Sequence, residues 1–109
     1  MARSDALQGA LPMLVLKILA RCGPMHGYAI TTQIETSSSE VLRVEEGSLY
    51  PALHRLEEAR LVKARWLVTP KNRRARVYEV TAAGRRELEA TGKRWRTVTL
   101  AVGQLLERI

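Results

Sequence analysis

The stretch EEGSLYPALHRLEEARLV, residues 45–62, decides the fold. With a rotation of about 100° per residue, its small and aliphatic residues share one side of a helix. These residues are Leu49, Ala52, Leu53, Leu56 and Ala59. The opposite side carries Tyr50, Pro51, His54, Arg55 and Glu58. The pattern predicts a helix over residues 46–59 that docks on a core by one side and presents polar and aromatic groups on the other.

The front end of this helix has features that suit an anionic partner. We expect the Ser48 hydroxyl to cap the helix. Pro51 then falls within the first turn, where its missing N–H costs little. The free N–H groups of a helix N-terminus attract phosphate, and this layout is typical of a recognition helix that enters a major groove by its N-terminal half. An ordinary amphipathic surface helix would share the apolar spacing, so the spacing alone does not separate the two interpretations.

The segment that follows favours nucleic acid. Two stretches rich in strand-forming residues, 61–69 and 76–81, flank the turn-forming PKNRRA, which predicts a β-hairpin. Between Arg60 and Tyr78 the chain has seven basic residues and no acidic one: Arg60, Lys63, Arg65, Lys71, Arg73, Arg74 and Arg76. A charge run of this kind is often only a solvated face. On a hairpin tip directly after a candidate recognition helix, it is better explained as a phosphate clamp.

Three further helices complete the expected architecture. Apolar spacing predicts helices over about 10–21, after a turn at 6–9, and over about 26–36. Thr81 is the expected N-cap of a long helix that runs to the C-terminus. The fold class is therefore mainly α with a small β-hairpin (α+β): a winged helix-turn-helix domain over 1–81 and a C-terminal helix over 82–109.

Composition limits the function classes. The 109 residues include 18 Lys and Arg against 11 Asp and Glu, giving a net charge of +7 and a pI near 10.3. This balance favours nucleic acid or an anionic membrane surface, although a merely soluble basic protein would share it. The longest apolar run is broken by Pro12 and Lys17, and no secretory signal is visible, so we expect a cytoplasmic protein with no membrane partner.

Catalytic and metal-binding patterns are not expected. His26 and His54 lack a cysteine or paired carboxylates at ligand spacing, and Cys22, the only cysteine, has no disulfide partner in the chain. No glycine-rich phosphate loop or nucleophile motif is present. We therefore predict no metal, no cofactor and no enzyme activity.

The C-terminal segment has an apolar seam that predicts a partner. Residues at alternating steps of three and four over three heptads are apolar except for Thr91, and the apolar ones are Leu88, Trp95, Val98, Val102, Leu105 and Ile109. Such a seam is typical of a coiled-coil interface, and a small domain has little core left to cover it. The alternative is a helix that folds back on its own domain. We expect these residues to form the interface of a homodimer.

Three stretches resemble the PadR-like transcriptional regulators in their short form: LQGALPMLVLKILARCGPMHGYAI (7–30), EEGSLYPALHRLEEARLV (45–62) and NRRARVYEVTAAGRREL (72–88). The strings GPMHGY and GSLYPAL are far more specific than a generic helix-turn-helix pattern. The resemblance implies a winged helix-turn-helix, a homodimer formed through the C-terminal helix, and repression of nearby genes relieved by a ligand. It also implies that Trp95 helps to line a pocket for a small aromatic effector.

Together with the charge pattern, the resemblance gives a set of candidate contacts to double-stranded DNA. They are Tyr28, Ser48, Tyr50, Pro51, His54, Arg55, Lys63, Lys71, Asn72, Arg73, Arg74 and Arg76. Tyr50 and Ser48 would contact a backbone phosphate, whereas His54 and Arg55 reach further and would contact base edges of an inverted-repeat operator. A winged-helix module that binds protein instead of DNA is the competing interpretation.

One departure from the family's pattern concerns the end of the third helix. Arg60 stands where the family usually has glycine, which accepts the left-handed conformation of a helix C-terminus. Either Arg60 takes that strained conformation or the helix ends in a different way.

Overall fold

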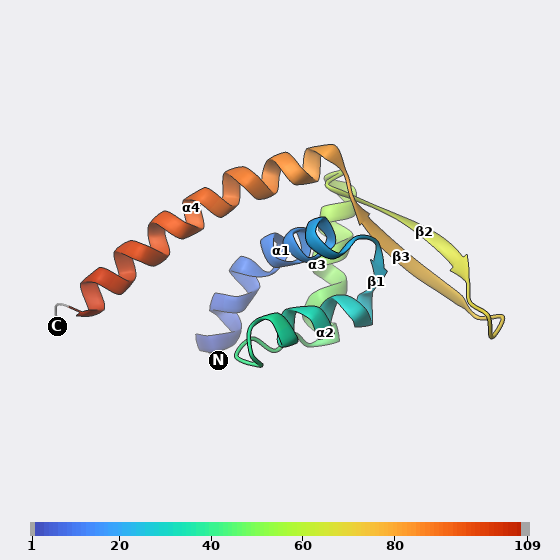
Figure 1. The fold of residues 1–109 in the computed structure, drawn as a ribbon, viewed down its shortest axis with the longest axis horizontal. Coiled ribbons are helices and arrows are strands. Elements are labelled where there is room, and N and C mark those ends of the chain that lie inside the picture. Colours follow the sequence, from blue (N-terminus) through green and yellow to red (C-terminus); the bar gives the residue numbers. More distant parts are fainter. Residues whose placement is uncertain (1, 108–109) are drawn as a thin grey trace.

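The computed structural model describes the backbone of residues 2–107 and side chains from residue 9 onward, so Ile109 of the predicted seam lies outside it. The elements are α1 (Ala2–Cys22), β1 (Met25–His26), α2 (Gly27–Ser37), α3 (Glu46–Glu58), β2 (Val62–Val68), β3 (Arg74–Val80) and α4 (Ala82–Glu107). The predicted α+β class is confirmed. Figure 1 shows α1, α2 and α3 packed together, with the β2–β3 hairpin projecting from one side and α4 from the other.

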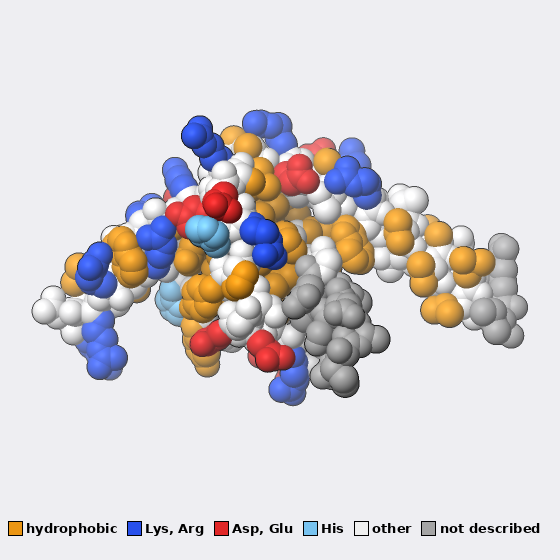
Figure 2. All heavy atoms as spheres, turned by 180° about the vertical axis from the view of Figure 1, so that it is seen from behind, with side chains coloured by type: hydrophobic (Ala, Val, Ile, Leu, Met, Phe, Trp, Pro, Cys, Tyr) orange, Lys and Arg blue, Asp and Glu red, His pale blue; other side chains and the backbone are white. Residues whose placement is uncertain are grey.

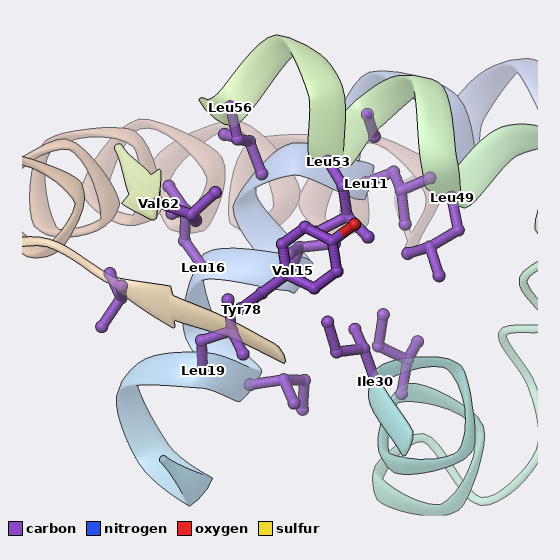
Figure 3. Close-up of a cluster of buried hydrophobic side chains, with 14 of the residues drawn as sticks. Leu11, Val15, Leu16, Leu19, Ile30, Leu49, Leu53, Leu56, Val62 and Tyr78 are labelled. Atoms are coloured by element: carbon purple, nitrogen blue, oxygen red, sulfur yellow. The ribbon is translucent and has the colours of Figure 1, made fainter. Parts of the chain in front are cut away.

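The core forms around α1, which contacts α2, α3, α4 and β3. Val15 and Leu19 of α1 are almost completely buried, and they meet Ile30 from α2 and Leu49 and Leu53 from α3. The sheet contributes three further buried side chains to the cluster: Val62, Tyr78 and Val80. Figure 3 shows the Tyr78 ring lying among the aliphatic side chains of α1 and α3. The base of the hairpin is therefore part of the hydrophobic core.

The sheet has three antiparallel strands in the order β1-β3-β2. The predicted hairpin pairs β2 with β3 from Val62 opposite Val80 to Val68 opposite Arg74. The short strand β1 was not predicted, because a two-residue strand is too short to show a periodic pattern. It lies beside β3 with Met25 opposite Tyr78.

One predicted helix start and one predicted helix cap are wrong. The expected turn at residues 6–9 is helical, since α1 begins at Ala2 and continues through Pro12, whose missing N–H removes only one helical hydrogen bond. Ser48 is not the cap of α3: the N-cap is Glu45, which makes no side-chain cap bond, and Ser48 lies inside the first turn with its N–H donated to the Glu45 carbonyl. Helix α2 is instead capped by His26, whose Nδ1 accepts from Ala29 N–H at 3.3 Å.

The third helix ends with Arg60 in the left-handed conformation, at φ 62°. Arg60 N–H donates to the Glu57 carbonyl, and Leu61 N–H donates to the Leu56 carbonyl at 2.9 Å. These two bonds form a Schellman motif, in which glycine is the usual residue at the left-handed position. Arg60 therefore adopts the left-handed conformation that a glycine would adopt at this position.

Thr81 links this helix end to α4. As predicted, its hydroxyl oxygen caps α4 by accepting from Gly84 N–H at 3.0 Å. The hydroxyl also lies 2.8 Å from the Arg60 carbonyl, and Thr81 N–H donates to the Leu61 carbonyl. Gly84 is required here, because an added Cβ would lie 2.1 Å from the Leu61 carbonyl oxygen. None of the helices within residues 2–107 is both long and apolar enough to cross a membrane.

We predict that Arg60→Gly stabilises the protein. A left-handed conformation costs a residue with a Cβ about 1 kcal/mol, so its relief should raise the melting temperature by about 4–8 °C in a domain of this size. Thermal unfolding at fixed protein concentration measures the change. The matched control is Arg60→Ala, which removes the same side chain but keeps the Cβ. An equal gain in both variants would contradict the strain.

Candidate nucleic-acid interface

Helix α3 has the two predicted sides. Leu49, Ala52, Leu53 and Leu56 are buried, whereas Tyr50, Pro51, His54, Arg55 and Glu58 are exposed. Ala59, predicted on the buried side, is exposed at the end of the helix. The His54 Nε2 atom lies 3.4 Å from a Glu58 carboxylate oxygen on the same helix, whereas Arg55 appears in no ion pair among the described residues.

Tyr50 connects α3 with the start of α2. A Cβ added at Gly27 would lie 2.7 Å from the Tyr50 hydroxyl oxygen and 3.0 Å from two ring carbons. The missing side chain of Gly27 therefore lets the Tyr50 ring lie against the N-terminus of α2. Tyr28 follows directly and is 69% exposed. Two tyrosine side chains and the positive end of a helix are thus brought to one place.

The tip of the β2–β3 hairpin, the wing, is a tight basic turn. Asn72 N–H donates to the Thr69 carbonyl at 2.8 Å, and Asn72 has a φ of 60°. This is a type I turn followed by a left-handed residue, with Pro70 at the second position, where its fixed φ fits. Asparagine tolerates the left-handed conformation better than most residues, so Asn72 has a structural role in the turn. Lys71, Arg73 and Arg74 are exposed around it.

Further down the wing, one indole lies against two guanidinium groups. The Arg74 guanidinium carbon lies 4.6 Å from the centroid of the Trp66 ring, and that of Arg76 lies 5.3 Å from it. Arg76 also donates from Nη2 to a Glu57 carboxylate oxygen of α3 at 2.7 Å. The predicted DNA contact Arg76 is thus already bound to an acidic side chain.

The opposite face of the wing carries a separate charged group. Lys63 and Arg65 lie 3.9 Å and 3.3 Å from the same Glu79 carboxylate oxygen. Lys63 stands opposite Glu79 in the register, whereas Trp66 stands opposite Arg76 on the other face. The structure therefore does not bring Lys63 together with Arg74 and Arg76.

A cleft of about 590 Å³ separates the wing from the two helix starts. The helices contribute His26, Gly27, Tyr28 and Tyr50 to its lining. The wing contributes Thr69, Pro70, Lys71, Arg73, Arg74, Ala75, Arg76 and Tyr78. No acidic residue lines this cleft. Figure 2 shows basic side chains along the projecting wing, interleaved with hydrophobic ones.

The cleft brings half of the predicted DNA contacts together: Tyr28, Tyr50, Lys71, Arg73, Arg74 and Arg76. Ser48, Pro51, His54, Arg55, Lys63 and Asn72 lie outside it. Sequence reasoning missed His26, Gly27 and Tyr78 as lining residues. The string GPMHGY contains the first two, but only the fold shows that Gly27 makes room for Tyr50.

Tyr78 closes the inner end of the cleft as a neutral group. Burial raises the pKa of its hydroxyl above the ordinary value, against the lowering effect of the nearby Arg76. Tyr78 therefore keeps its proton throughout the physiological range, and its ring belongs to the core.

The long helix α4 carries an uncovered apolar surface away from the wing. Trp95 and Val102 are 37% and 48% exposed, and Val98 and Leu105 are more exposed still. Leu106 adds to this surface, although the heptad pattern did not include it, whereas the exposed Leu100 lies on a different side of α4. Leu88 differs from the other predicted interface residues because it packs partly against the core of its own chain.

A second, larger groove of about 1050 Å³ runs between α1 and α4. Met13, Leu14 and Lys17 line it from α1, and Trp95 and Leu100 line it from α4. The groove is open to solvent along one side. Among the described residues, no group of three or more His, Cys, Asp or Glu could hold a metal ion.

The winged-helix fold and the basic wing define a class of transcriptional regulators. Residues 15–90 match the model of the Transcriptional regulator PadR-like family, and the chain belongs to this family.

Individual relatives agree with this assignment. A PadR family transcriptional regulator from Eggerthella lenta superposes with a TM-score of 0.79 at 30% identity, covering 94% of this chain and 87% of that one. Bacillus subtilis PadR in complex with operator DNA superposes with a TM-score of 0.65 at 24% identity, covering 73% of this chain and 45% of that one.

One sequence relative is a much larger protein, and only a part of it matches this chain. An uncharacterised 37.1 kDa protein in transposon TN4556 of Streptomyces fradiae is 47% identical over 77 residues, which are 71% of this chain. The match covers only 20% of that protein.

We predict that Gly27→Ala moves Tyr50 without unfolding the chain. The added Cβ meets the free end of a ring that is 45% exposed and can swing away, so stability should change by less than about 1 kcal/mol. The Tyr50 ring resonances should shift in NMR spectra. The control is Gly84→Ala, whose Cβ meets the Leu61 backbone carbonyl and should cost about 2 kcal/mol. Unshifted Tyr50 resonances would contradict the contact.

Proposed function

We propose that this protein is a DNA-binding transcriptional regulator that binds an inverted-repeat operator as a homodimer. The observation that carries the proposal is the acid-free cleft between the wing and the starts of α2 and α3. Within the described chain, Lys71, Arg73 and Arg74 have no ion-pair partner, so their charges remain free for a polyanion. The operator complex of Bacillus subtilis PadR supports this choice of partner.

Each part of the surface has its own role in the proposal. Wing residues Lys71, Arg73 and Arg74 bind phosphates and supply affinity that is independent of sequence. Tyr50 donates its hydroxyl to a backbone phosphate at the mouth of the groove. Arg55, which is exposed and has no acidic partner among the described residues, reads a base edge from α3.

The homodimer accounts for the uncovered apolar surface of α4. A stripe that includes Val98, Val102 and Leu105 leaves apolar area in water along a helix that projects from its own domain (Figure 1). Burial of apolar area is favourable at about 25 cal/mol per Å². A second copy of α4 would cover the stripe. It would also place the two α3 helices for half-sites about 34–36 Å apart on one side of the duplex.

Repression relieved by a small aromatic ligand is the mode of regulation in this proposal, as the resemblance implies. The groove between α1 and α4 supports it by presenting the Trp95 indole beside the apolar Leu14 and Leu88. A flat aromatic molecule would stack on Trp95, and Lys17 and Arg21 at the groove would favour an anionic substituent.

Selection from random DNA duplexes tests the proposal. We expect the protein to enrich an inverted repeat, and we expect Arg55→Ala to lose about 1–3 kcal/mol on that site while relaxing one position in each half. Lys93→Ala, which removes a cation on the outer part of α4, is the control and should recover the unchanged motif. A wild-type selection without any enriched motif would favour the competing protein-interaction module.

We predict that Val98→Glu with Val102→Glu produces a monomer. Two charges on the stripe would have to be buried without partners in the dimer, which is strongly unfavourable. Sedimentation at micromolar concentration should show the wild type at twice the mass of the variant. Gln104→Glu adds a charge on the same stretch of α4 away from the stripe and should leave the dimer intact. A monomeric wild type would contradict the dimer.

A further inference from the structure

The ion pair between Glu57 and Arg76 differs from the other ion pairs of the described chain. It is the shortest of them at 2.7 Å, and both side chains are only about one third exposed, at 33% and 34%. The other pairs have at least one side chain that is more than half exposed. It joins α3, which carries the candidate base reader Arg55, to the wing strand β3.

Arg76 occupies a particular place along the wing. Strand β1 supports β3 only at Val77 and Tyr78. From Arg76 outward, β2 and β3 form a two-stranded ribbon with no third strand beside it, as Figure 1 shows. Isolated two-stranded hairpins are only marginally stable. The first residue beyond the three-stranded part is therefore the one that is tied to α3.

Trp66 adds a second restraint at the same level. It stands directly opposite Arg76 in the register, and its ring lies beneath the guanidinium groups of both Arg76 and Arg74. The planar guanidinium of Arg76 can thus stack on an indole while it binds a carboxylate at its edge. Arg74, at the outer end of β3, is stacked on the same ring, which connects the tip with the pair.

We propose that Glu57, Arg76 and Trp66 form a latch that fixes the wing relative to α3, and that Arg76 acts as a positioning residue and not as a phosphate contact. This inference rests on the proposed DNA binding and deepens it. The latch sets the width of the cleft, so that Lys71 and Arg73 meet phosphates while α3 lies in the groove. Glu57, an acidic residue on a DNA-facing helix, then acts in favour of DNA binding.

The direction in which Glu57→Gln changes DNA affinity distinguishes the latch from general electrostatic attraction. Glu57→Gln removes a negative charge, and general attraction to DNA alone would tighten binding. The latch predicts weaker binding to the selected operator, by about tenfold. The matched control is Glu58→Gln, the neighbouring acid, whose partner His54 is on its own helix. It should bind as well as the wild type or better. Tighter binding by both variants would overturn the proposal.

A charge reversal tests whether the pair acts as a unit. Glu57→Arg and Arg76→Glu should each weaken operator binding, and the double variant should recover most of the loss. If Arg76 contacted a phosphate directly, Glu57→Arg alone would tighten binding or leave it unchanged, because it replaces a negative charge with a positive one. Arg73→Ala provides the comparison for a true phosphate contact. It should reduce the slope of log binding constant against log salt concentration by about 1. Trp66→Leu, which leaves both charges in place, should weaken binding less than Glu57→Gln does.

Hydrogen exchange of the free protein separates failure of the latch from failure of the proposed function. In Glu57→Gln, the amides of β2 and β3 that lie on the tip side of the Arg65–Val77 pair should exchange faster. The amides of β3 that pair with β1 should not change. This readout needs no DNA. Unchanged exchange at the outer wing would overturn the latch even if the protein binds its operator. Faster exchange with unchanged operator affinity would overturn its role in DNA binding.

Discussion

The docking of α3 on α1 is the contact on which the rest of the structure depends. Leu49 and Leu53 are buried against Val15 and its neighbours, which leaves only one side of α3 to face outward. That side carries Tyr50, and the Tyr50 ring reaches the N-terminus of α2 only because Gly27 has no side chain. The same helix ends in the Schellman turn from which β2 departs, so the orientation of α3 also fixes the start of the wing.

The wing depends on restraints at two levels. At its base, Val62 and Val80 are buried in the core, and Thr81 binds the carbonyl of Arg60. Further out, the ion pair between Arg76 and Glu57 connects the ribbon with α3. A basic loop on a free ribbon would bind phosphate, but it would not hold a fixed distance from α3. Restraint of the outer wing therefore matters more for the choice of site than for general attraction to DNA.

Sequence reasoning predicts the parts of the fold whose residues show a clear hydrophobic periodicity or a specific local signal. The buried side of α3, the hairpin and the Thr81 cap follow from spacing and local chemistry, and all three are confirmed. It misplaces features that depend on tertiary partners. Ser48 resembles a cap, yet it lies inside the first turn of α3, and β1 forms by pairing with the edge of β3. The candidate site shows the same limit. Charge counting finds Arg76 among the wing cations, but only the fold shows that Glu57 has already bound it.

Helix α1 packs on one side against α2 and α3, which carry the proposed DNA-binding face, and on another side it lines the groove shared with α4. Val15 and Leu19 on its buried side pack among the residues that hold α2 and α3. Met13, Leu14 and Lys17 face the groove shared with α4. Closely packed interiors transmit displacement because they contain little free volume. A molecule that enters the groove beside Trp95 must therefore either fit the existing separation of α1 and α4 or move α1. In the second case, the contacts that Val15 and Leu19 make with α2 and α3 would change as well. The structure thus provides a short physical connection between the groove and the proposed DNA-binding face, through one helix and the side chains buried beneath it.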